Sequence, residues 1–181
     1  MDSIQPFLGF ETKPTGRPLV VVDLGYSANQ RSCGLAWTGA SGGVEVQFGQ
    51  AVVRTQKLLA ALESPVLVLE AVLSTYHRAD GNPDLRGDFE RGRGWYWGAG
   101  VLTFAAALRF LKVLGQRLPP DMRVWIAEAF LSNKSKRASH ADDAMEILWS
   151  FWRTVPEQLR DGVEPASELI QGVPSIRVFR I

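Results

Sequence analysis

Acidic side chains end three apolar runs of this sequence and begin one segment with helical periodicity. Asp23 follows LVVV, Glu70 follows VLVL, and Glu128 lies near the end of RVWIAEAF. Asp142 and Asp143 stand side by side at the start of the helical segment. Carboxylates that are packed together repel one another unless a proton or a cation neutralises them. If these segments meet in the fold, their acids form a site suited to a divalent cation.

The chemistry of such a site follows from its ligands. Carboxylates offer only oxygen, and Mg²⁺ and Mn²⁺ both prefer carboxylate and water ligands. Two such ions roughly 3.5–4 Å apart can activate a water molecule and stabilise the leaving oxygen of a phosphodiester. Each acid also has a plainer interpretation. A strand-end acid is often a solvated turn residue, the helix dipole favours acids in a first turn, and Glu128 could pair with a basic residue of the next loop.

The elements that must position these acids follow the order β-β-β-α-β-α-β-α. Periodicity and turn residues predict strands at 19–23, 32–38, 44–48, 66–69 and 123–130, and helices at 52–63, 95–116 and 140–153. The first three strands form an antiparallel meander, and helical crossovers make the later strands parallel to the first. We therefore predict an α/β fold, with a mixed five-stranded sheet covered by helices on both faces.

Parallel strands place their carboxyl ends at one edge of a sheet, where open α/β sheets bind ligands. Asp23, Glu70 and Glu128 should therefore lie near one another. The first turn of the last helix, with Ser139 as its predicted N-cap, should bring Asp142 and Asp143 to the same edge.

The chain is expected to form one domain over residues 1–181. Its 46% apolar residues and 22% charged residues are typical of a globular protein with its own core. Residues 1–18 are interrupted by prolines and should form an irregular lead-in. Residues 154–181 form a C-terminal extension, in which 175–181 alternate as in an edge strand.

Charge and cysteine content exclude several classes of protein. Twenty basic and nineteen acidic side chains nearly balance, so the chain is no bulk polycation. The single Cys33 excludes an internal disulfide framework and a cysteine-rich zinc site. The longest apolar stretch is well short of the about 20 residues that span a bilayer, and the first residues lack the pattern of a secretory signal. We expect a cytoplasmic protein without a membrane partner.

The positions of the acids resemble those of a known superfamily. An Asp-Leu-Gly sequence at Asp23, a Glu that ends the fourth strand (Glu70) and a His-x-Asp-Asp-Ala sequence at 140–144 are similar to the ribonuclease H-like superfamily. The likeness covers roughly residues 19–153 and is nearest to bacterial Holliday-junction resolvases and related uncharacterised predicted nucleases. It implies a nuclease in which Asp23, Glu70 and Asp143 hold Mg²⁺ or Mn²⁺, with Asp142 as the alternative or additional ligand. It also implies a nucleic-acid substrate and a homodimer.

Two basic segments could contact such a substrate. Arg91 and Arg93 precede Trp95, Tyr96 and Trp97, and this mixture of cations and aromatic rings suits single-stranded nucleic acid. The plainer interpretation is a solvated loop that leads into core aromatic residues. Lys134 and Lys136 precede the acid pair and could contact phosphates, or belong to an ordinary solvated loop.

Two other functions are compatible with this order of elements. The first is a non-catalytic module that binds a ligand or partner through residues 74–97, with structural acids. The second is a phosphotransferase similar to sugar and acetate kinases, which need a second domain and a longer chain to close over ATP.

Overall fold

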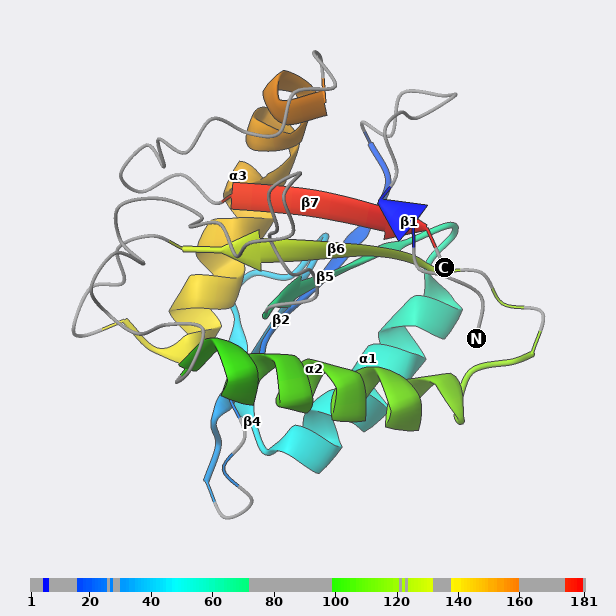
Figure 1. The fold of residues 1–181 in the computed structure, drawn as a ribbon, viewed down its shortest axis with the longest axis vertical. Coiled ribbons are helices and arrows are strands. Elements are labelled where there is room, and N and C mark those ends of the chain that lie inside the picture. The colour runs from blue at the N-terminus through cyan, green and yellow to red at the C-terminus, as the bar shows by residue number, and fades with distance from the viewer. Residues whose placement is uncertain are drawn as a thin grey trace, which may run out of the picture.

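The computed structural model describes residues 5–6, 16–25, 27, 30–71, 99–120, 122, 124–131, 138–159 and 175–180 (Figure 1). Along the chain, its strands and helices follow one another as β1 (Gln5–Pro6), β2 (Leu19–Asp23), β3 (Cys33–Trp37), β4 (Val44–Val46), α1 (Phe48–Ala61), β5 (Val66–Glu70), α2 (Ala99–Gly115), β6 (Trp125–Phe130), α3 (His140–Leu159) and β7 (Ser175–Arg180).

The strands form one mixed sheet in the order β1-β7-β6-β5-β2-β3-β4. β2, β5 and β6 run parallel, whereas β3 and β4 continue from β2 as an antiparallel meander. The predicted α/β class, the five predicted strands and the parallel direction of the acid-bearing strands are confirmed. β7, predicted as an edge strand, pairs antiparallel with β6, and the two-residue β1 pairs with its outer side. Among the residues that the structure describes, the sheet therefore has seven strands rather than five, and the lead-in contributes one of them.

Several predicted boundaries differ from the observed ones. Helix α1 begins at Phe48, a residue predicted to lie in a strand. The ring of Phe48 packs edge-to-face on Phe110 of α2, with centroids 5.9 Å apart. Helix α3 continues to Leu159, past the predicted end at 153 and through Pro156. The predicted start of the second helix at 95 lies outside the described residues.

Helices cover both faces of the sheet, as predicted (Figure 1). On one face, α1 and α2 pack on alternate residues of β2 and β5, among them Val20 and Leu67. On the other face, α3 packs on the residues between them, among them Val21 and Val68. Because both faces are covered, every residue of β2 and β5 is buried, which explains their continuous apolar sequences.

Strand alternation decides which face each acid takes. Successive side chains point to opposite faces, so Asp23 follows Val21 onto the face that α3 covers. Glu70 follows Val68 onto the same face, and the two acids are direct partners in the parallel pairing of β2 and β5. Glu128 follows Ile126 onto the opposite face, with α1 and α2.

Candidate metal centre

Three carboxylates from three separate elements converge at the carboxyl ends of the parallel strands. Asp23 of β2, Glu70 of β5 and Asp143 of α3 each offer one oxygen, and these oxygens all lie within 4.8 Å of one another. The three residues are buried, with 3%, 8% and 5% of their surface exposed. The arrangement is therefore a compact, all-oxygen donor set enclosed by protein.

The backbone of β3 lets α3 approach the sheet closely enough to complete this cluster. A Cβ on Gly34, which pairs with Asp23, would overlap the main-chain carbonyl of His140 and lie 2.8 Å from the nitrogen of Ala141. A Cβ on Gly43 would overlap the carbonyl of Ala141. One glycine in β3 and one directly before β4 therefore allow the first turn of α3 to rest on main chain, a close approach that side chains prevent.

A capping box begins α3 and uses Asp142. The Ser139 main-chain N–H and hydroxyl donate to Asp142 Oδ2 at 3.0 and 2.8 Å, and the Asp142 N–H donates to Ser139 Oγ at 3.1 Å. The predicted N-cap is confirmed, and these two donors hold the pKa of the Asp142 carboxyl below its usual value. Asp142 is exposed and lies outside the cluster. Neighbouring helix residues point about 100° apart, so only Asp143 of the pair faces the sheet.

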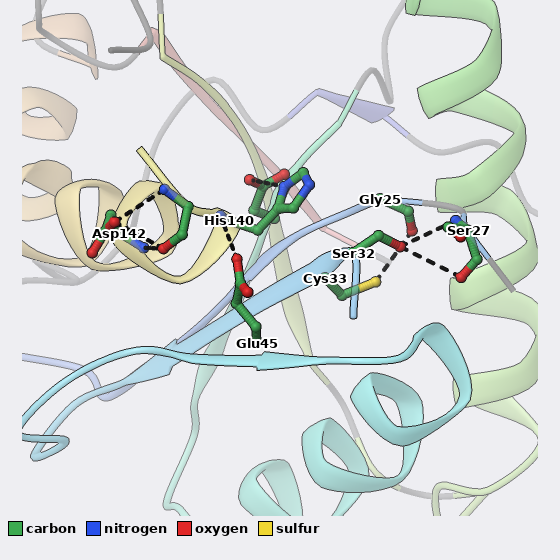
Figure 2. A network of polar contacts seen from close by, with 9 residues as sticks. Gly25, Ser27, Ser32, Cys33, Glu45, His140 and Asp142 are labelled. Atoms are coloured by element: carbon green, nitrogen blue, oxygen red, sulfur yellow. Dashed lines mark hydrogen bonds and ion pairs between the residues drawn. The ribbon is translucent and has the colours of Figure 1, made fainter. Parts of the chain in front are cut away.

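His140, which the sequence offered as a residue that could orient the acids but which is not among the predicted site residues, contacts the cluster. Its Nδ1 lies 2.7 Å from Asp23 Oδ2, and its main-chain N–H donates to Glu45 Oε1 at 3.2 Å (Figure 2). The signal in the sequence was its spacing, because residues three apart share a helix face and His140 precedes Asp143 by three. Its side chain is 39% exposed, whereas that of Asp23 is 4% exposed, so the imidazole stands between solvent and the cluster.

The remaining predicted residues do not join the cluster or lie outside the description. Glu128 is fully buried on the far face and belongs to no cluster of ligands among the described residues. The four basic residues that we predicted to bind substrate, Arg91, Arg93, Lys134 and Lys136, lie outside the described residues.

Cys33 lies beside the end of β2 and is buried. Its thiol donates to the carbonyl of Gly25 at 3.1 Å, which ties β3 to the chain that leaves Asp23 (Figure 2). Burial raises the pKa of Cys33 to about 11, and the negative charge of Asp23 adds to the rise. The thiol therefore stays protonated near neutral pH and serves as a hydrogen-bond donor.

Comparisons with protein-family models, with curated proteins and with solved structures find no match for this chain. In the part of the chain that the structure describes, no helix is both long enough and apolar enough to cross a membrane. The geometry of the cluster is therefore the observation from which a function can be argued.

Proposed function

We propose that this chain is a divalent-metal-dependent nuclease that hydrolyses phosphodiester bonds at Asp23, Glu70 and Asp143. The observation that carries the proposal is the meeting of three buried carboxylates from β2, β5 and α3, with ligand oxygens within 4.8 Å of one another. The order of elements and the positions of these acids also support a ribonuclease H-like scaffold.

The donor set fits Mg²⁺ or Mn²⁺ better than a softer metal. All three side chains offer hard oxygen ligands, which these ions prefer. Cys33, which burial keeps as a thiol, does not belong to the set. A bound divalent ion would activate water and stabilise the charge that develops on a phosphodiester.

The chain itself contributes a preorganised arrangement of negative charge. Asp23 and Glu70 are held in register by the parallel pairing of β2 and β5, so their spacing changes little. His140 contacts Asp23 through Nδ1 and orients that carboxylate. Asp143 approaches from the first turn of α3, which is seated on the backbone of β3. Close carboxylates repel one another, so the rigid sheet and the seated helix must hold them together.

The proposed substrate is a polyanion because basic residues precede the site in the sequence. Lys134 and Lys136 stand a few residues before His140, and Arg91 and Arg93 precede a run of aromatic residues. Cations beside a carboxylate cluster would attract phosphates that the acids alone repel. Nucleic acid combines the phosphates with bases that can stack on aromatic rings.

Two neighbouring acids of α3 provide a matched test. Asp143→Asn removes a carboxylate from the cluster, and Asp142→Asn makes the same chemical change one residue earlier, outside it. With Mn²⁺ or Mg²⁺, the wild-type chain and Asp142→Asn should cleave labelled single-stranded or double-stranded DNA or RNA. Asp143→Asn should show background cleavage only, and chelation by EDTA should reduce all three proteins to that level.

Metal binding is measured separately, through the rise in melting temperature that Mn²⁺ produces. The wild-type chain and Asp142→Asn should show the rise, and Asp143→Asn should not. Equal cleavage by wild type and Asp143→Asn would contradict the proposal. A wild-type protein that binds Mn²⁺, cleaves none of these substrates and still binds a ligand would instead favour the non-catalytic module.

A further inference from the structure

Glu45 of β4 contacts the helix that carries Asp143, although it lies 95 residues earlier in the sequence. Its Oε1 accepts a hydrogen bond from the main-chain N–H of His140 at 3.2 Å (Figure 2). The first N–H groups of a helix have no partner within the helix, and a carboxylate near that end is favoured by the helix dipole. Glu45 therefore joins the outer strand of the meander to the first residue of α3.

The turn that Glu45 holds is the turn that completes the cluster. His140 and Asp143 are three residues apart on α3, and their side chains reach Asp23 and the carboxylate cluster respectively. Close carboxylates repel one another, so the cluster depends on contacts that hold this turn to the strands, among them that of His140 Nδ1 with Asp23. The capping box of Ser139 and Asp142 stabilises the helix end but is local to α3. It cannot fix where the helix end lies relative to the strands.

Apolar side chains further along α3 pack on the sheet, but the first turn of the helix meets glycine there, so polar contacts help to fix its position. The first turn rests on Gly34 of β3 and on Gly43, which directly precedes β4, and neither has a side chain that could interlock with the helix. The hydrogen bond from His140 to Glu45 and the contact of His140 Nδ1 with Asp23 both have a direction and a length, and together they oppose a displacement of this turn.

We propose that Glu45 is a positioning residue for the carboxylate cluster. By accepting the His140 N–H, it holds Asp143 at the distance from Asp23 and Glu70 at which one divalent ion can contact all three, and so it sets the affinity for that ion. This inference rests on the proposed function only in requiring that the cluster binds a divalent ion, and it requires no cleavage.

Three variants of the full chain separate the hydrogen bond from the charge. Glu45→Ala removes both the acceptor and the charge, and Glu45→Gln keeps an acceptor oxygen but removes the charge. Glu63→Ala removes an exposed acid just after α1 and serves as the control for net charge. Binding of Mn²⁺ is followed by electron paramagnetic resonance, in which the signal of the free hydrated ion disappears on binding. Circular dichroism in EDTA confirms that each variant is folded.

The dissociation constant for Mn²⁺ should rise about tenfold in Glu45→Ala, as outer-shell changes do at other metal sites. In Glu45→Gln and Glu63→Ala it should stay within about twofold of wild type, since an intact acceptor or a remote charge leaves the helix in place. A wild-type affinity for Mn²⁺ in Glu45→Gln, together with a weakened affinity in Glu45→Ala, is a result that loss of charge alone would not produce.

Two results would overturn this inference and leave the proposed function standing. One is unchanged Mn²⁺ affinity in Glu45→Ala, and the other is equal weakening in Glu45→Ala and Glu45→Gln, which would assign the effect to charge. A wild-type chain that takes up no Mn²⁺ would overturn the proposed function and this inference together.

Discussion

Gly34 offers a direct test of how closely the site depends on the seating of α3. In Gly34→Ala, the new methyl group would overlap the carbonyl of His140 and lie 2.8 Å from the nitrogen of Ala141. Ordinary contact begins at 3.4 Å, so the contact with Ala141 alone requires the backbone of α3 to withdraw by about 0.6 Å, and the closer overlap with the His140 carbonyl requires a larger shift. The obstacle is backbone rather than the end of a flexible side chain, and the whole first turn must therefore move.

This displacement exceeds the tolerance of ligand distances in a metal site, and it also lowers the free energy of unfolding. Ligand distances in metal sites hold to within about 0.2 Å, so a shift of about 0.6 Å carries Asp143 out of the set. An overpacked core typically loses about 1–3 kcal/mol of unfolding free energy. We expect Gly34→Ala to unfold at a lower urea concentration in EDTA, with a loss in that range, and to lose its Mn²⁺ affinity.

Gly42→Ala is the matched control for this change. Gly42 lies in the turn between β3 and β4, and no atom of the described residues lies within 4 Å of the position of its Cβ. Its backbone needs no left-handed conformation, so the alanine should alter neither urea unfolding nor Mn²⁺ affinity. If Gly34→Ala behaved as this control does, the argument that backbone contact seats α3 and positions Asp143 would be refuted.

Two further predictions concern groups with shifted pKa values. Because the N–H and hydroxyl of Ser139 lower the pKa of Asp142 from its usual 3.8, its contribution to stability is present above that value and is lost as the pH falls through the lower folded pKa. The difference in urea unfolding between wild type and Asp142→Asn should therefore be largest near neutral pH and should shrink as the pH falls below 3.8, and a constant difference would contradict the capping role. Burial raises the pKa of Cys33 from 9.0 to about 11, so its contribution to stability is present below 9.0 and is lost as the pH rises from 9.0 to about 11. At about pH 8.5, iodoacetamide should label Cys33 far more slowly in the folded chain than in urea, and equal rates would show that the thiol is accessible.

Local sequence was sufficient for the class of fold and for part of the site. The runs LVVVD and VLVLE are continuous in apolar residues, short and followed by acids, which is typical of parallel strands buried on both faces. Once two strands are parallel, their last residues share an edge, so the meeting of Asp23 and Glu70 followed from pattern alone. The predicted N-cap at Ser139 also depended only on neighbours in the chain.

Tertiary packing decided the rest, because it depends on rotations and distances that no local pattern contains. Asp142 and Asp143 are equivalent in sequence until α3 docks on β3, when one faces the sheet and the other closes a capping box. Glu128 resembled the other strand-end acids, but strand alternation turned it to the opposite face. The contact of Glu45 with His140 joins positions 95 residues apart, and it exists only because a bare glycine backbone lets a helix approach a strand there.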